Sequence, residues 1–346
     1  MFERGTRKRL LIVPIFIPNQ GCPYRCIYCH QEKITSQPTQ PVGQSTIKQT
    51  LHNAINATGF DSSPDPEVAF YGGTFTRLPV GRIQEMLEAV APFLREGLFK
   101  SIRVSTRPDS LQQEQLHLMR KLGVTTVELG TQSMDDRVLE LSRRGHTAKD
   151  TVESVRLLKE LGFKVGIQLM PGLPGDSEEV FKKTVGEVIE LRPDMVRLYP
   201  TLVIKGTELA TWFRENRYHP LALDAAVGIC QESCVRLEEK GIPVIRIGVM
   251  SSPTLIPGDE IMAGPWHSAF GFLVRSGIHQ EKIASYLQRQ GVAGNIRLRV
   301  PPGEIPLVRG YKNRGLRLIE EKTGAKIVDT IDDDAVPSGQ VRVDVV

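Results

Sequence analysis

Three of the five cysteines stand close together near the N-terminus, at Cys22, Cys26 and Cys29. Their C-x3-C-x2-C spacing, on a loop that follows an apolar run, lets three thiolates bind one metal cluster. Iron–sulfur clusters normally take four cysteines, so three leave one iron open to a further ligand. The amino and carboxylate groups of S-adenosylmethionine can fill that place. We therefore expect a [4Fe-4S] cluster that cleaves this cofactor to a 5′-deoxyadenosyl radical.

Zinc is the alternative partner of these thiolates. A structural zinc ion takes four nitrogen or sulfur ligands, and His30 could supply the fourth. An aromatic residue before the third cysteine, Tyr28, favours the cluster, because with this spacing it resembles the signature of the radical S-adenosylmethionine (radical SAM) superfamily. That resemblance implies that Tyr28 packs near the adenine of the cofactor.

A glycine pair follows the second expected strand, at Gly72 and Gly73, with Thr74 after it. Glycines at such a place let a ligand approach bare backbone, although a Gly-Gly pair by itself more often marks a turn. In the superfamily that the chain resembles, a glycine-rich segment here meets the amino group of the cofactor. The resemblance therefore implies that these three residues bind S-adenosylmethionine.

Polar residues also end the next three strands, at Ser105, Gln132 and Gln168. These segments resemble the radical domains of the Elongator catalytic subunit and of oxygen-independent coproporphyrinogen oxidases. The resemblance implies that Gln132 and Arg144 hold the ribose and carboxylate of the cofactor, and a guanidinium can bind both carboxylate oxygens at once. A surface arginine ahead of a helix is the alternative for Arg144. Ser105 and Gln168 are also expected to contact the cofactor, although relatives carry a glutamate and an aspartate there.

Three sequence segments, at 143–147, 170–175 and 198–207, resemble the Elongator catalytic subunit family more closely than other branches of the superfamily. This resemblance covers roughly residues 10 to 220, and members of that family act on the wobble uridine of transfer RNA. The chain departs from them in its short cysteine spacing. It also leaves no segment for the family's acetyltransferase domain, so the resemblance does not extend to acetyl-CoA chemistry.

The motifs are set on alternating strand and helix patterns, which are typical of a parallel sheet with crossover helices. The expected strands are 10–17, 67–71, 101–105, 125–129, 164–169 and 195–199, with a seventh at 244–247. The expected helices include 81–94, 111–122, 147–161, 177–190 and 222–240. Because the motifs fall at the C-terminal ends of strands, we predict an α/β fold, a partial (βα)6 TIM-like radical SAM barrel.

The composition changes after Val249, and we expect further segments there. We assign residues 1–250 to the barrel, 251–293 to a connecting segment with a Pro-rich loop at 251–258 and a helix near 280–289, and 294–346 to a small α+β domain. The expected order in that domain is strand, short helix, turn, helix and two strands, which resembles a KH RNA-binding module. Its backbone-clamping loop would be 310–313, with Asn313 in the final glycine position because asparagine tolerates a left-handed backbone.

Basic residues surround that loop. Eight Lys or Arg stand against three Glu between residues 296 and 326, an excess expected where a protein contacts phosphates. The expected RNA-binding residues are Arg309, Gly310, Lys312, Asn313 and Arg314. The alternative is a small α/β appendage with a solvated basic face.

Cys230 and Cys234 lie one turn apart on the expected helix 222–240, so they share a face. They could bind a metal or give a hydrogen atom to a radical, but a buried cysteine on an amphipathic helix is usually a small hydrophobe. The sequence assigns no catalytic residue.

The net charge of +4 over 346 residues does not by itself indicate a nucleic-acid partner. No apolar stretch approaches the roughly 20 residues of a membrane helix, and the cysteine spacing indicates ligands in a reducing compartment rather than disulfides. We expect a cytoplasmic monomer that modifies a base in RNA, with transfer RNA as the main candidate. We expect its electrons to come from a flavodoxin or ferredoxin.

Two rival functions stay open from the sequence. A radical SAM enzyme acting on a small molecule such as a tetrapyrrole would keep its turnover without residues 294–346. A non-catalytic RNA-binding protein with a structural cluster would produce no 5′-deoxyadenosine under any reductant.

Overall fold

The computed structural model describes residues 11–60, 65–249, 253, 255 and 257–346. The chain divides into two compact units, which are described separately. The larger comprises the described residues up to Ala226 together with Arg236–Trp266, and the smaller comprises Val227–Val235 and His267–Val346. Leu10 of the first expected strand and half of the expected 251–258 loop lie outside the described residues.

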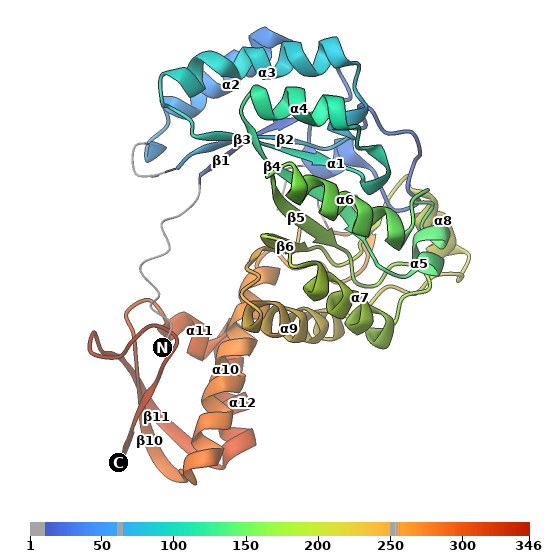
Figure 1. The fold of residues 1–346 in the computed structure, drawn as a ribbon. Coiled ribbons are helices and arrows are strands. Elements are labelled where there is room, and N and C mark those ends of the chain that lie inside the picture. The colour runs from blue at the N-terminus through green and yellow to red at the C-terminus, as the bar shows by residue number, and fades with distance from the viewer. Residues whose placement is uncertain (1–10, 61–64, 250–252, 254, 256) are drawn as a thin grey trace. The chain divides into compact units, whose positions relative to one another are not determined.

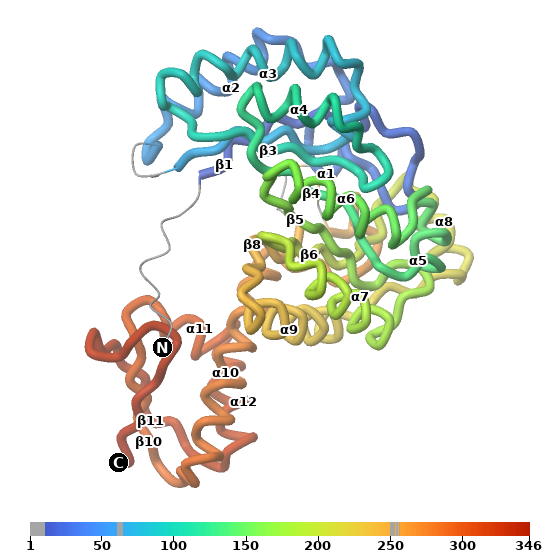
Figure 2. The backbone as a smooth tube through the Cα atoms, in the orientation of Figure 1, coloured from blue at the N-terminus to red at the C-terminus, as the bar shows by residue number. Residues whose placement is uncertain are grey.

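The larger unit is built on a parallel sheet of seven strands in the order β1-β2-β3-β4-β5-β6-β8. The strands are β1 (Ile12–Phe16), β2 (Glu67–Tyr71), β3 (Ser101–Thr106), β4 (Val124–Gln132), β5 (Lys164–Leu169), β6 (Met195–Leu198) and β8 (Val244–Ile247). All neighbouring pairs are parallel. The sheet curls into a half-barrel with β1 and β8 at its edges, and Figure 2 shows β8 beside β6. The expected fold is confirmed, with β8 as the seventh strand.

Crossover helices lie along the outer side of this sheet (Figure 1). They are α2 (Gln44–Ile55), α3 (Val80–Arg95), α4 (Gln113–Lys121), α6 (Ala148–Glu160) and α7 (Glu178–Leu191). In α3, apolar residues at helical spacing, among them Ile83, Leu87 and Val90, are buried. A capping box fixes the start of α6, because Thr147 and Asp150 each accept the other's backbone N–H. The amphipathic pattern and the caps therefore account for where these helices lie.

Shorter elements complete the larger unit. They are α1 (Gln31–Thr35), α5 (Asp136–Leu141), α8 (Glu208–Arg214) and an antiparallel pair of β7 (Val203–Ile204) and β9 (Ile261–Ala263). Helix α9 (Leu223–Glu239) contributes its middle part to the smaller unit. Among the described residues, no helix is long and apolar enough to cross a membrane.

The smaller unit has a three-stranded sheet in the order β11-β10-β12. Strand β10 (Gly294–Val300) is parallel to β11 (Ala325–Asp332) and antiparallel to β12 (Arg342–Val345). Helices α10 (Phe270–Gln290), α11 (Ile305–Arg309) and α12 (Arg314–Thr323) accompany it. The order strand, helix, turn, helix, strand, strand is the one expected from the sequence.

Helix α10 differs from expectation. We placed a short helix near 280–289 inside a connecting segment, but α10 begins at Phe270 and its Ile283 and Leu287 share one core with the sheet and with α11 and α12. The smaller unit includes His267–Val346, whereas we expected the small domain to start near Gly294. Glycine disfavours helices, but Gly277 lies inside α10. Here a Cβ at Gly277 would lie 1.8 Å from Nε2 of Gln231, so the glycine makes room for a neighbouring side chain.

Candidate cluster and cofactor site

The three cysteines lie on the loop between β1 and α1, at the carboxyl edge of the sheet. Cys26 is buried, and Cys22 and Cys29 are half-buried. Burial, and then the neighbouring thiols of Cys26 and Cys22, raise the pKa of Cys29 to about 12. The three sulfur atoms are therefore near enough to act on one another electrostatically, as ligands of a common group must be.

The alternative of zinc needs a fourth nitrogen or sulfur ligand beside the three thiols. His30, the residue considered for that place, stands at the N-cap of α1. In a [4Fe-4S] cluster each thiolate instead binds a different iron, and three thiolates leave one iron open.

Arg144 reaches this loop from the segment after α5. The residue is 6% exposed, unlike the surface arginine of the alternative interpretation. Its Nη1 donates to Sγ of Cys26 over 3.0 Å, and its Nη2 donates to the carbonyl of Gly130. Its Nε is buried without a partner among the described residues. A guanidinium with an unused donor beside a cluster ligand is suited to a carboxylate that binds next to the open iron.

Gln132 lies beside Arg144 at the end of β4. A bulge interrupts the pairing of β4 with β5 between Leu129 and Gln132, and Gln132 has a φ of 70°. A Cβ on Gly130 would lie 3.0 Å from Nε2 of Gln132 and 3.3 Å from Nη2 of Arg144. The bare backbone of Gly130 therefore lets both side chains converge. The expected pairing of Gln132 with Arg144 has a geometric basis in this glycine.

The glycine pair after β2 packs against the cluster loop. Gly72 and Gly73 have φ values of 81° and 60°, which favour glycine. A Cβ on Gly73 would lie 2.2 Å from the carbonyl oxygen of Gln20. The N–H of Thr74 donates to that same carbonyl over 2.7 Å, and its Oγ1 lies 3.5 Å from Sγ of Cys22. The pair therefore joins the cluster loop to the sheet.

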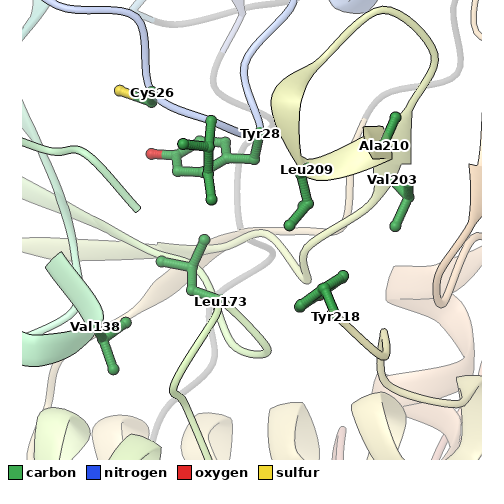
Figure 3. Packing of buried hydrophobic residues seen from close by; sticks show 9 residues of the cluster. Cys26, Tyr28, Val138, Leu173, Val203, Leu209, Ala210 and Tyr218 are labelled. Carbon is green, nitrogen blue, oxygen red and sulfur yellow. The ribbon is translucent and has the colours of Figure 1, made fainter. Parts of the chain in front are cut away.

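Tyr28 is packed in an apolar cluster beside the cysteines (Figure 3). Its neighbours in that cluster include Cys26, Leu173 and Leu209. The tyrosine is 8% exposed. This packing fixes the last part of the cluster loop, while a contact with the adenine of a cofactor stays a prediction.

A charged network lines the inner face of the half-barrel, and the sequence analysis missed it. Arg103 pairs with Glu67 through Nε over 2.9 Å and with Glu128 over 2.5 Å. Arg197 on β6 pairs with Glu128 over 2.9 Å and donates to the hydroxyl of Tyr71 on β2. Strands β2 and β6 are not neighbours, so these side chains can meet only inside the curl. The sequence contains a sign of this network, because charged residues interrupt the apolar runs of these strands.

Ser105 and Gln168 share this inner face. The strand registers pair Ser105 with Glu128 and Gln168 with Arg197. Nε2 of Gln168 donates to Oε1 of Gln132 over 3.3 Å. At these two positions this chain therefore has neutral side chains, and that of Gln168 orients Gln132.

Cys230 and Cys234 do not join the cluster site. Both are fully buried in α9 within the smaller unit. Burial, and then Cys234, raise the pKa of the Cys230 thiol. Because the thiolate is the reactive and metal-binding form, the structure favours the small hydrophobe over a ligand or hydrogen donor.

The expected RNA loop, Gly310–Asn313, joins α11 to α12. Gly310, Lys312 and Asn313 have φ values of 66°, 53° and 60°. Asn313 thus has the left-handed conformation that its residue type tolerates. The residues of this loop other than Gly310 are exposed.

Some basic residues of the smaller unit pair with carboxylates. Arg299 on β10 lies 2.6 Å from Asp344, and Lys322 pairs with Glu281. Around the loop, by contrast, four exposed cations have no ion pair among the described residues, namely Arg309, Lys312, Arg314 and Arg317. The same holds for four exposed cations elsewhere in this unit, namely Lys282, Arg289, Lys326 and Arg342. The loop and the start of α12 differ in bringing four such cations close together along the chain.

A parallel half-barrel with three thiols and a buried arginine at its carboxyl edge defines an iron–sulfur protein that binds a small cofactor there. The Radical SAM superfamily profile matches residues 16–188, and that of the Radical_SAM C-terminal domain matches residues 193–280. The chain belongs to the radical SAM superfamily. This family uses a [4Fe-4S] cluster and S-adenosylmethionine, so both expected cofactors and the expected enzyme class are confirmed.

Curated relatives extend the match to one branch. The tRNA uridine(34) acetyltransferase of Methanocaldococcus jannaschii is 43% identical over 129 residues, covering 36% of this chain and 24% of that protein. Its namesake from Dehalococcoides mccartyi is 32% identical, covering 60% and 52%. Elongator complex protein 3 of Homo sapiens is 29% identical, covering 62% and 47%. The chain spans about half or less of the length of these relatives.

A solved structure supports the same branch. Archaeal Elp3 of Methanocaldococcus infernus, with an N-terminal deletion, superposes with a TM-score of 0.60 at 25% identity, covering 82% of this chain and 68% of that one. The resemblance to the Elongator branch is thereby confirmed.

Proposed function

We propose that this chain modifies a base of transfer RNA by radical chemistry. When bound, the cluster and S-adenosylmethionine supply a 5′-deoxyadenosyl radical. The names of its relatives, which refer to uridine 34 of tRNA, support an RNA substrate. The observation that carries the proposal is the set of unpaired cations around Gly310–Asn313, on a unit separate from the half-barrel.

In the half-barrel, each candidate residue has a task. Cys22, Cys26 and Cys29 hold the cluster, and Arg144 binds the cofactor carboxylate. The remaining cofactor contacts come from residues on the strand ends and the cluster loop, namely Tyr28, Gly72, Gly73, Thr74, Ser105, Gln132 and Gln168. The buried network of Arg103, Arg197 and their carboxylates keeps the inner face rigid beneath them.

In the smaller unit, the loop takes the RNA. Arg309, Lys312 and Arg314 contact phosphates, while Gly310 and Asn313 let the backbone of the loop approach the nucleic acid closely. Tyr311, between them, is 43% exposed and lies edge-on to His267 with 5.1 Å between the ring centroids. We assign the radical chemistry to residues 1–250 and RNA docking to residues 294–346 together with α10.

The remaining partners follow from this chemistry. The cluster needs one electron at a time, and a reduced flavodoxin or ferredoxin in the cytoplasm can deliver it. A single chain carries both the cofactor residues and the RNA loop, so we propose that a monomer acts.

Binding of bulk transfer RNA to the full chain tests the RNA assignment. We expect the double variant Lys312→Ala with Arg314→Ala to bind at least tenfold more weakly at about 0.1 M salt. The slope of log affinity against log salt should fall by roughly 1.5, because about two phosphate contacts are lost.

A matched control has the same change of charge elsewhere. Lys149 and Lys183 are exposed, and each faces a glutamate one helical turn away. The double variant Lys149→Ala with Lys183→Ala should bind like the wild type. Equal losses in the two double variants would contradict the loop assignment, and no tRNA binding by the wild type would favour the small-molecule rival.

A further inference from the structure

Gln31, the first residue of α1, turns its side chain back to the cluster loop. Its Oε1 accepts a hydrogen bond from the N–H of Gly73 over 2.8 Å and another from the N–H of Asn19. Asn19 lies before the cysteines along the chain, and Gly73 belongs to the glycine pair after β2. One amide oxygen therefore ties together the start of the cluster loop, its end and the proposed cofactor segment.

This junction is closely packed. A Cβ on Gly72 would lie 3.2 Å from Oε1 of Gln31. Asn19 and Gly73 are both half-buried, and their N–H groups would lose their acceptor if the oxygen were removed. The glycine segment would then have to move to find another acceptor, because an unpaired donor in a partly buried place is unfavourable.

We infer that Gln31 is a positioning residue that couples the loop of the three cysteines to the cofactor segment, with its oxygen fixing the N–H groups of Asn19 and Gly73. The inference rests on the proposed cluster ligands and on the proposed contact of the glycine pair with the cofactor. It is independent of the RNA substrate.

Two substitutions test the role of the amide oxygen. Gln31→Glu keeps an oxygen for the two N–H groups. Gln31→Leu has none. Gln49 on α2 is exposed and bonds only Asn53, so Gln49→Leu is a matched control.

The measurements are made on the anaerobically reconstituted full chain. Equilibrium binding gives the affinity for S-adenosylmethionine, and the iron content gives the loading of the cluster. We expect Gln31→Leu to bind the cofactor about tenfold more weakly and Gln31→Glu to stay within about threefold of the wild type.

The outcomes distinguish this inference from the proposed function. If the wild-type protein binds no cluster, the proposed site itself is contradicted. A loaded Gln31→Leu variant with the affinity of the wild type would overturn only the role of Gln31. If Gln31→Leu fails to fold, Gln31→Met decides in its place, because it also lacks the acceptor oxygen and keeps the length of the side chain.

Discussion

The guanidinium of Arg144 donates a hydrogen bond to Sγ of Cys26 over 3.0 Å, across 118 positions of the sequence. Its other amino group donates to the carbonyl of Gly130 at the end of β4. The cation is therefore held between the thiol of a proposed cluster ligand and a strand end. A cofactor carboxylate bound beside that thiol would meet this guanidinium.

Replacement of Arg144 by lysine tests that placement. Arg144→Lys keeps the positive charge but loses the planar pair of donors, so we expect S-adenosylmethionine to bind about tenfold to a hundredfold more weakly with the iron content unchanged. The neighbouring Arg143 is 59% exposed and pairs with Glu208, which makes Arg143→Lys a close control. Cofactor affinity that is equal in the two variants would remove Arg144 from the site.

Gly73 supports the cluster loop by its lack of a side chain. In Gly73→Ala the new Cβ would lie 2.2 Å from the carbonyl oxygen of Gln20, at a φ of 60°. We expect the loop to shift and the reconstituted protein to hold less than about half the iron of the wild type. Gly81 in α3 has no atom within 4 Å of an added Cβ, so Gly81→Ala should load normally. Full loading of Gly73→Ala would show that the loop tolerates the clash.

The buried ion pairs of Arg103 predict a large loss of stability when this side chain is replaced by an uncharged one. Arg103→Met leaves Glu67 and Glu128 without this partner in the interior, which should lower the free energy of unfolding by about 3 to 5 kcal/mol. Lys149 and Glu153 form an exposed pair at 3.7 Å, so Lys149→Met should cost less than about 1 kcal/mol. Urea denaturation of both variants measures the difference. Similar values would mean that the inner network is not tightly coupled.

Asp176 predicts a pH dependence of stability. Burial raises its pKa in the folded chain to about 6, although its carboxylate accepts the N–H of Gly172 over 2.8 Å. Below that pKa the folded state binds more protons than the unfolded state, so this residue's contribution to stability falls as the pH rises toward and through about 6. Asp176→Asn lacks this term and should gain about 1 kcal/mol over the wild type between pH 5 and pH 7.5. A difference independent of pH would contradict the raised pKa.

Much of the fold could be predicted because its strands are short, apolar and separated by clear helical patterns. β2, β5 and β8 have the bounds that we expected. Helix α10 was cut short because helix propensity cannot show that Gly277 faces Gln231. Tertiary packing decided that element.

The candidate cluster ligands could be proposed from the sequence because they lie close together in it. The spacing of Cys22, Cys26 and Cys29 alone indicates that they bind one common group. Contacts between distant segments could not be predicted from the sequence. The amide of Gln31 meets Gly73, and Arg103 meets Glu128, only after the sheet has formed and curled.

Production of 5′-deoxyadenosine is the most direct test of the central proposal. The chain would be reconstituted anaerobically with iron and sulfide, then given S-adenosylmethionine and dithionite, with and without bulk transfer RNA. We predict production that transfer RNA stimulates. Production indifferent to RNA would contradict the RNA substrate, and none from a fully loaded cluster would contradict the radical chemistry itself.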